Sequence, residues 1–247
     1  MMHMRVILPL LGSKMEFTFG IITSGAEDDS INQIIDSIEK QNIPTYEIII
    51  VGNSKVSRNK TRIVQFNDEV IPKWITRKKN IITNIAKFEN IVYLHDYVIF
   101  TDDWYKGFLE FGNDFDLCMT KITNHDETRY RDWCICMWDN PTIMEIAGPN
   151  RKCILPYDDN RFKRHMYFSG TYWVSKKKIM REFPLNEQLV WGQGEDVLWS
   201  RQVRERYEFC MNKYSEVKLL KQKEVSYEIA DQNTVEEFDR ALNNFKN

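Results

Sequence analysis

Two adjacent carboxylates, Glu195 and Asp196, stand in the segment VWGQGEDVLWSRQVRER (residues 190–206), directly after Gly192 and Gly194. The segment predicts the start of an amphipathic helix, where free N–H groups and the helix dipole favour ionised acidic side chains. The pair could simply begin that helix. It could also serve as a general base that accepts the proton of a bound hydroxyl group. The motif alone leaves both interpretations open.

Trp191 and Gly194 precede these carboxylates and could form part of a binding surface. Glycine adopts positive φ and lets the backbone approach a ligand closely, and an indole ring offers an apolar face to a sugar ring. Core packing is an equally good explanation for Trp191.

Other polar residues follow predicted buried strands. Apolar runs at residues 17–22, 46–51 and 90–94 are typical of strands buried on both faces of a parallel sheet. The polar residues that follow these runs are Thr23, Ser24, Asn53, His95 and Asp96. In parallel α/β sheets, ligands bind at the carboxyl ends of the strands, so these positions are candidate contacts, although each could also be ordinary turn chemistry.

The order of predicted elements indicates an α/β fold, because strands alternate with helices at residues 28–41 and 74–86. We expect a central, mostly parallel, Rossmann-like sheet flanked by helices. Residues 124–164 predict a hairpin and long loops on the ligand face. The remaining predictions are strands at 61–66, 116–123, 132–137, 165–174, 218–220 and 225–229, and helices at 104–111, 176–182, 195–207 and 235–245.

Composition fits one globular domain of 247 residues, with 43% hydrophobic and 28% charged residues. The formal net charge of -2 does not favour a nucleic-acid partner. We interpret the basic runs at residues 77–79 and 176–178 as solvated helix faces. The apolar stretch at residues 6–11 is too short to span a membrane, and five irregularly spaced cysteines are typical of reduced thiols. These features predict a cytoplasmic protein without a transmembrane segment.

The order of the motifs resembles the glycosyltransferase A fold, most closely family 2 type nucleotide-sugar transferases. The resemblance covers residues 17–207 and rests on YLHDYVIF, then FSGTYWVSKKKI, then WGQGEDVLWSRQVR. The last two motifs are also similar to a galactosyltransferase pattern with a Glu-Asp segment. The resemblance implies a single domain, residues 1–247, with a nucleotide-sugar-binding half (17–100), an acceptor-binding half (101–230) and a terminal helix (231–247).

The resemblance also implies roles for individual residues. Asp196 would be the base of an inverting transfer and Glu195 its partner, and Trp191, Gly194 and Gly170 would contact the acceptor. The donor would be a nucleotide diphosphate sugar, with a UDP-sugar as the expected form, and the acceptor a glycan or glycoconjugate hydroxyl. The residues implied to contact the donor are Thr23, Ser24, Asn53, Arg77, Asn80, His95 and Asp96.

Family members usually hold Mn²⁺ or Mg²⁺ at an acidic DxD motif, and here His95, Asp96 and Tyr97 occupy that place. A hard divalent cation prefers oxygen ligands, so the single carboxylate departs from the family pattern. The resemblance implies a metal at Asp96, with His95 and His165 as further ligands. For His165, a hydrogen-bonded structural histidine is the alternative.

Two alternatives to a glycosyltransferase remain. One is a catalytically degenerate module that binds a nucleotide or glycan, which the incomplete DxD motif favours. The other is a sugar-1-phosphate nucleotidyltransferase, a class that typically opens with a glycine-rich basic loop after the first strand. In this chain the segment TSGAEDD (residues 23–29) is acidic instead, which disfavours that class.

Overall fold

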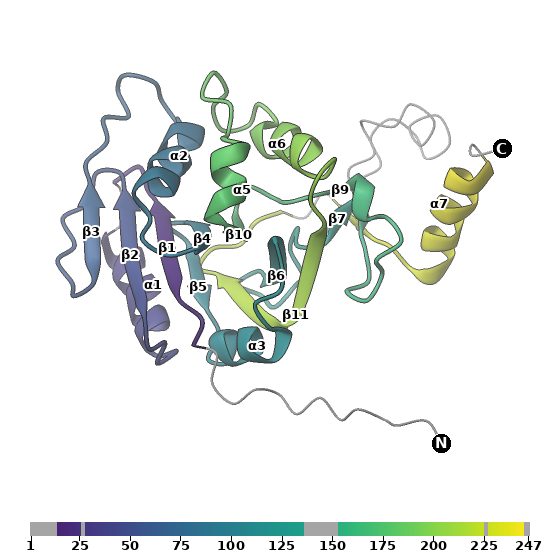
Figure 1. Cartoon of the computed structure of the whole chain (residues 1–247), viewed down its shortest axis with the longest axis horizontal. Helices are drawn as coiled ribbons and strands as arrows, with labels where there is room; N and C mark the ends of the chain where they lie inside the picture. Colours follow the sequence, from purple (N-terminus) through teal and green to yellow (C-terminus); the bar gives the residue numbers. More distant parts are fainter. Residues whose placement is uncertain (1–13, 26–27, 136–152, 225–226, 245–247) are drawn as a thin grey trace.

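An eight-stranded sheet forms the centre of the computed structural model, which describes residues 14–25, 28–135, 153–224 and 227–244 (Figure 1). The strand order is β3-β2-β1-β4-β10-β6-β11-β5. Four of the seven neighbouring pairs are parallel and three are antiparallel. The predicted α/β sheet with flanking helices is therefore confirmed.

The first half of the sheet consists of parallel strands with helical connections, as predicted. Its elements are β1 (Phe17–Ile22), α1 (Asp28–Glu39), β2 (Tyr46–Val51), β3 (Thr61–Val64), α2 (Ile75–Ile85) and β4 (Asn90–His95). The β-branched run of β2 and the apolar β1 are buried because helices cover both sides of this half, with α2 in front of the strands and α1 behind them in Figure 1.

The two faces of strand β1 pack against different helices. Phe17 and Phe19 point to one face, where their rings lie 5.2 Å and 5.6 Å from the ring of Trp104 in α3 (Trp104–Phe111). Gly20 faces α2 on the other side, and a Cβ at this position would lie 2.4 Å from Ile82 Cγ2. The glycine therefore allows α2 to pack directly on β1, which brings the buried face of α2 close to the carboxyl end of the sheet.

The second half of the sheet contains β5 (Val98–Phe100), β6 (Leu117–Thr123), β10 (Tyr172–Lys176) and β11 (Phe209–Leu219). Strand β10 is antiparallel to both β4 and β6, so β6 runs in the direction of β4, and β11 is parallel to β6. As a consequence, the carboxyl ends of β1, β4, β6 and β11 lie on the same edge of the sheet.

A small second sheet has the order β12-β8-β7-β9. Its strands are β12 (Glu228–Ile229), β8 (Cys153–Ile154), β7 (Cys134–Ile135) and β9 (Met166–Tyr167). The antiparallel pair of β7 and β8 agrees with the predicted hairpin in residues 124–164. Only residues 134–135 of the strand predicted at 132–137 are a strand, and residues 136–137 lie outside the described part of the chain.

Three strand predictions in the C-terminal half are wrong in extent. Of the strand predicted at 225–229, only Glu228–Ile229 is a strand, and residues 225–226 lie outside the described part of the chain. The run 165–174 is divided between a 3₁₀ turn (η1, Lys163–His165), β9 and β10, because the chain changes sheets after Tyr167. The strand predicted at 218–220 is the end of the 11-residue β11. The remaining helices are α5 (Lys177–Glu182), α6 (Glu195–Val203) and α7 (Gln232–Asn244).

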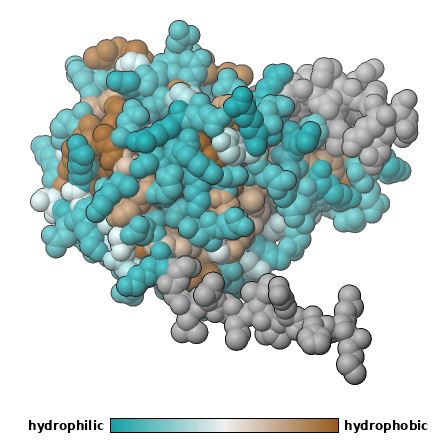
Figure 2. Space-filling view, in the orientation of Figure 1, coloured by the Kyte–Doolittle hydropathy of each residue, from teal (hydrophilic) through white to brown (hydrophobic). Residues whose placement is uncertain are grey.

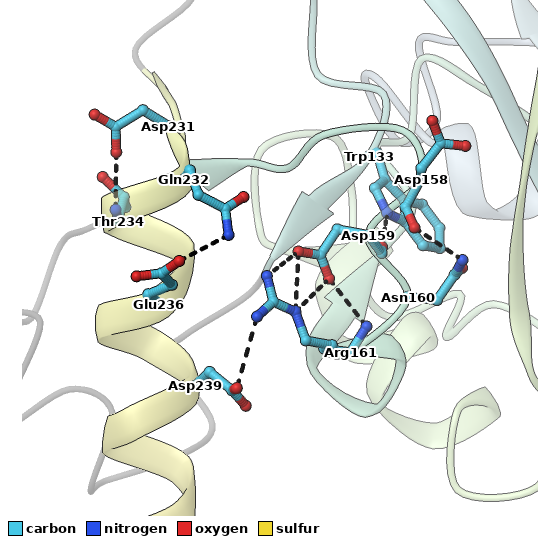
Figure 3. A network of polar contacts seen from close by, with 10 residues as sticks. All are labelled: Trp133, Asp158, Asp159, Asn160, Arg161, Asp231, Gln232, Thr234, Glu236 and Asp239. Carbon is cyan, nitrogen blue, oxygen red and sulfur yellow. Dashed lines mark hydrogen bonds and ion pairs between the residues drawn. The ribbon is translucent and has the colours of Figure 1, made fainter.

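Helix α7 lies at the periphery of the molecule and is attached through the 158–162 segment (Figure 3). Arg161 forms ion pairs with Asp159 at 2.7 Å and with Asp239 of α7 at 3.6 Å. The rings of Phe162 and Phe238 add an apolar contact, with centroids 6.2 Å apart. The segment is in turn held by the indole of Trp133, which donates to the Asp159 carbonyl.

The face of the molecule in Figure 2 is largely hydrophilic, and its apolar residues form separate patches. On the part of this face that the described residues form, hydrophilic side chains separate the apolar patches from one another (Figure 2). Within the described ranges, none of the helices combines the length and apolar composition needed to cross a membrane.

Candidate active site

Two side chains from neighbouring parallel strands meet at the carboxyl edge of the sheet. Thr23 follows β1 and Asp96 follows β4, and the Thr23 hydroxyl donates a hydrogen bond to Asp96 Oδ2 at 2.7 Å. The Gly25 N–H donates to Thr23 Oγ1 at 3.0 Å. These bonds fix the orientation of the Asp96 carboxylate, as expected for residues that end adjacent parallel strands.

A cavity of about 510 Å³ opens beside this pair, and we call it the donor cavity. Its lining residues are Ile22, Thr23, Ser24, Asp68, Pro72, Lys73, Ile75, Lys78, His95, Asp96, Tyr97, Trp191, Lys221 and Lys223. Its volume lies within the usual range of small-molecule sites. Of the residues implied to contact the donor, the structure therefore brings together Thr23, Ser24, His95 and Asp96.

A second cavity of about 440 Å³, which we call the acceptor cavity, contains the carboxylate pair. Its lining residues are His95, Tyr130, Arg131, Ser169, Gly170, Thr171, Trp191, Glu195, Asp196, Lys221, Gln222, Lys223 and Glu224. Four residues, His95, Trp191, Lys221 and Lys223, line both cavities, so the two are adjoining parts of one groove.

The carboxylate pair begins helix α6, as the sequence predicts. Gly194 precedes the helix with a φ of 73°, a left-handed conformation that glycine adopts without strain. Asp196 is half-buried, and its Oδ2 accepts the Gly170 N–H at 2.7 Å. Glu195 is buried, and burial together with the neighbouring Asp196 carboxylate raises the Glu195 pKa. The two carboxylates thus have different environments within one cavity.

Gly170 is positioned by the residues that surround it. A Cβ at this position would lie 3.3 Å from Asp196 Oδ2 and 3.5 Å from Glu195 Oε1, so any larger residue would require the Asp196 carboxylate to shift by a few tenths of an ångström. On the other side of the peptide chain, the Lys79 ammonium donates to the Gly170 carbonyl at 2.6 Å. Gly170 therefore lies between a buried cation and the carboxylate pair.

Lys79 is a buried cation of α2, and its Nζ lies 4.1 Å from the centroid of the Trp173 ring. Burial lowers the pKa of Lys79 to about 7, although the Glu195 and Asp196 carboxylates act in the opposite direction. Its neighbour Lys78 is also buried, and its ammonium donates to the Thr23 carbonyl at 2.6 Å and to Asp68 at 2.8 Å.

The interpretation of residues 77–79 as a solvated helix face is therefore wrong for two of the three residues. Lys78 and Lys79 are only 3% and 2% exposed, whereas Arg77 is exposed. Helical spacing could have predicted this burial. Positions 78 and 79 lie three and four residues after the buried Ile75 and therefore share its helix face. The corresponding interpretation of residues 176–178 holds for Lys178, whose side chain is 60% exposed. It is wrong for Lys176, which ends strand β10, is half-buried and donates to the side chains of Asn90 and Asn113.

Arg77 and Asn80 lie away from both cavities and bind the chain that leads into α6. Arg77 Nη1 donates to both carboxylate oxygens of Glu187, at 2.9 Å and 3.0 Å. The Asn80 amide donates to the Leu185 carbonyl and to Glu187, each at 2.9 Å. Asn53 also lines neither cavity, and its side chain is exposed. The structure does not bring these three residues to the groove.

Trp191 lies at the junction of the two cavities and is 51% exposed, so it does not serve mainly as a core residue. Its backbone N–H donates to the Lys73 carbonyl at 3.1 Å, and the Lys73 ammonium lies 4.9 Å from its ring centroid. The indole therefore offers an accessible apolar face at the point where the cavities meet.

The residues implied to bind a metal do not form a complete ligand set. Asp96 provides one carboxylate, one oxygen of which accepts the Thr23 hydroxyl, and the His95 side chain is hydrogen-bonded to the backbone of Gly170. His165 belongs to η1 and lines neither cavity. Across the described ranges, no group of three or more His, Cys, Asp or Glu side chains is arranged to hold a metal ion. These residues do not fit the oxygen-rich ligand set that Mn²⁺ or Mg²⁺ requires.

Lys221 and Lys223 are site residues that sequence reasoning missed. They follow the end of β11, and the orientation of that strand brings them to the same edge as Thr23 and Asp96. The Leu220 N–H donates to the Tyr97 carbonyl at 2.9 Å, which fixes this segment beside the end of β4. Two lysines directly after a strand could have indicated this part of the site. Only residues 218–220 of this region were predicted as a strand, so the full β11 and its direction were not foreseen.

Comparisons with known proteins identify the fold. No protein-family model matches the sequence, and no curated protein matches it significantly. Among solved structures, S. aureus TarS 1-349 in complex with UDP-GlcNAc matches with a TM-score of 0.54 and 14% identity, covering 92% of this chain and 65% of that one. GalNAc-T7 with UDP, GalNAc and Mn²⁺ matches with a TM-score of 0.52 and 10% identity, covering 92% of this chain and 47% of that one.

The full-length S. aureus TarS structure matches with a TM-score of 0.52 and 15% identity over 92% of this chain, which spans 38% of TarS. The present chain thus spans less than two thirds of each of these structures. The similarities show that it has the glycosyltransferase A fold, in agreement with the resemblance of its motifs.

Proposed function

We propose that the chain is a glycosyltransferase that moves a sugar from a nucleotide diphosphate sugar to a hydroxyl group of a glycan or glycoconjugate. The observation that supports this most is the continuous groove, in which Thr23 and Asp96 line one part and Glu195 and Asp196 line the other. A transferase of this kind needs two substrates side by side, with a carboxylate on the acceptor side.

The donor cavity is the proposed site of the nucleotide, and Thr23, Ser24 and Asp96 are its proposed polar contacts. Structures of similar fold contain UDP-GlcNAc or UDP, which supports a UDP-sugar as the donor. The sugar would then extend past Trp191 toward the acceptor cavity, because this residue lines both cavities.

The proposed reaction is an inverting displacement. The acceptor oxygen attacks the anomeric carbon, its proton passes to an Asp196 carboxylate oxygen, and the bond from the anomeric carbon to the diphosphate oxygen breaks. Asp196 suits this role because it stands in the first turn of α6, where the dipole favours a carboxylate, and lines the acceptor cavity. Glu195 is the proposed partner that orients acceptor hydroxyls.

Replacing the proposed base gives the decisive test. Asp196→Asn removes the proton acceptor and leaves the shape of the site nearly unchanged. We expect transfer from a panel of nucleotide sugars to fall by roughly 10²–10⁴-fold, the usual contribution of a positioned base. Product formation and nucleotide release are the measurements. Binding of UDP, measured by calorimetry, should stay close to that of the wild type.

The matched control is Asp102→Asn, which makes the same change at an exposed position outside both cavities. Full transferase activity in the Asp196 variant would remove Asp196 as the base. Nucleotide binding without any turnover in the wild type, across the whole panel, would favour the alternative of a catalytically degenerate binding module.

A further inference from the structure

Lysine ammonium groups gather where the donor and acceptor cavities meet. Lys221 and Lys223 line both cavities, and Lys73 lines the donor cavity and lies over Trp191. In a transfer between the two cavities, the diphosphate must occupy their junction, because it connects the nucleoside to the anomeric carbon. These lysines are therefore placed beside the expected position of the leaving group.

The three ammonium groups are held in place by aromatic rings rather than by direct ion pairs. Lys221 Nζ lies 4.0 Å from the centroid of the Tyr97 ring, and Lys223 Nζ lies 4.8 Å from it and donates to the Tyr97 hydroxyl at 2.9 Å. Among the residues that the structure describes, Lys73, Lys221 and Lys223 form no direct ion pair, although burial lowers the pKa of Lys223 and the Asp196 carboxylate is near enough to oppose this effect. Ring faces attract cations while leaving their N–H donors available to a ligand.

The other charged residues of the donor cavity are one ion pair and one carboxylate. Lys78 forms an ion pair with Asp68 at 2.7 Å, and Asp96 accepts the Thr23 hydroxyl. Lys73, Lys221 and Lys223 outweigh the single negative charge of Asp96 in this cavity, whereas the carboxylates Glu195, Asp196 and Glu224 line the adjoining acceptor cavity. A diphosphate in the donor cavity would therefore meet an excess of positive charge. The chain thus presents ammonium groups at the position where the usual divalent cation of this fold lacks a complete ligand set.

We infer that Lys221 and Lys223, assisted by Lys73, bind the donor's diphosphate and neutralise its charge in place of a divalent metal ion. The inference rests on the proposed function, because it assigns the charge-neutralising group of that same reaction. When the bond to the anomeric carbon breaks, the electron pair stays on the diphosphate oxygen. Ammonium groups aimed at this oxygen would stabilise the departing nucleoside diphosphate.

The test compares the binding of UDP and UMP by calorimetry, in EDTA and in MnCl₂. The ratio of the two affinities isolates the contribution of the β-phosphate. We expect the full-length protein to prefer UDP by roughly tenfold or more in EDTA, the size of one or two charge-assisted hydrogen bonds, and MnCl₂ to leave the ratio unchanged. The variant Lys221→Gln/Lys223→Gln should bind UDP no better than UMP, and Lys221→Arg should keep the preference.

The matched control is Lys218→Gln, which removes a β11 lysine that pairs with Glu127 outside both cavities. Lys221 is exposed, so the single variant Lys221→Gln tests the inference even if changes at Lys223 disturb folding. A UDP preference that requires Mn²⁺, is lost in Asp96→Asn and survives both lysine changes would overturn this inference but leave the proposed function intact. Absence of binding to UDP, GDP, ADP or dTDP in both buffers would contradict the proposed function as well.

Discussion

At the scale of single residues, the backbone of Gly170 connects the buried part of α2 with the proposed base. Its N–H donates to Asp196 and its carbonyl accepts the ammonium of Lys79. Lys79 lines neither cavity, so its proposed contribution is to position Gly170 and, through it, Asp196. To act as a cation here, Lys79 must stay protonated while it is buried. Burial disfavours the protonated form, so this role costs free energy of folding.

The lowered pKa of Lys79 predicts how the free energy of unfolding depends on pH. Burial lowers the pKa of Lys79 to about 7, whereas a lysine in an unfolded chain titrates near 10.4. Between these values the unfolded chain binds a proton that the folded chain does not, so the free energy of unfolding rises with pH. Relative to Lys79→Met, the wild type should gain on the order of 1 kcal/mol per pH unit across this window.

Urea unfolding of both proteins at several pH values between about 7 and 10 measures this difference, because the contributions of other titrating groups cancel. Glu195 and Asp196 are the charged neighbours that oppose the shift, and the slope should be largest between the folded and unfolded pKa values, where only the unfolded chain holds the proton. Lys178→Met, which removes an exposed lysine, should show no such trend. A constant difference between wild type and Lys79→Met would show that Lys79 stays charged in the folded protein.

At the scale of elements, the strands that are buried on both faces are the ones that the sequence predicts best. The buried strands β1, β2 and β4 are continuous apolar runs, and the polar residues that follow them indicate the carboxyl edge without a structure. Thr23 and Asp96 could therefore be placed in one site before their hydrogen bond was known. The same argument failed for Asn53, whose side chain turns to solvent after Gly52.

Strand β11 shows why part of the site could not be predicted. Its register shifts between Asn212 and Glu216, and buried Asn212 and Ser215 hydrogen-bond to each other at 2.9 Å within this irregularity. A bulge of this kind interrupts the two-residue alternation that identifies a strand. The length and direction of β11 were therefore hidden, and with them the placement of Lys221 and Lys223.

The terminal helix α7 gives a prediction at the same scale. Asp231 immediately precedes the helix, and its Oδ1 accepts the Thr234 N–H at 2.8 Å, which satisfies one of the free donors of the first turn. Asp231→Ala should lower stability by about 1 kcal/mol, measured by urea unfolding. The control Asp239→Ala removes a half-exposed ion pair with Arg161 and should cost less. Equal losses in both variants would contradict a capping role for Asp231.

At the scale of the whole molecule, net charge and local charge have opposite signs. The chain carries a formal charge of -2, which by itself disfavours an anionic ligand. The junction of the two cavities nevertheless presents Lys73, Lys221 and Lys223 without carboxylate partners among the described residues. Charges on cavity walls act over about 10 Å at 0.1 M salt, so at the junction these lysines contribute a positive field that the carboxylates Asp96, Glu195, Asp196 and Glu224 of the same groove oppose.

This local field predicts a specific response to salt. Raising ionic strength from about 0.05 M to about 0.5 M should weaken UDP binding several-fold, because screening shortens the reach of the lysines. Uridine has no phosphate, so its affinity should change little over the same range, which makes it the control for effects of salt on the nucleoside part of the cavity. Calorimetry with both ligands measures the two slopes. If UDP and uridine respond equally, the lysines contribute no net attraction for the phosphates. If salt strengthens UDP binding, negative charge outweighs the lysines at the groove.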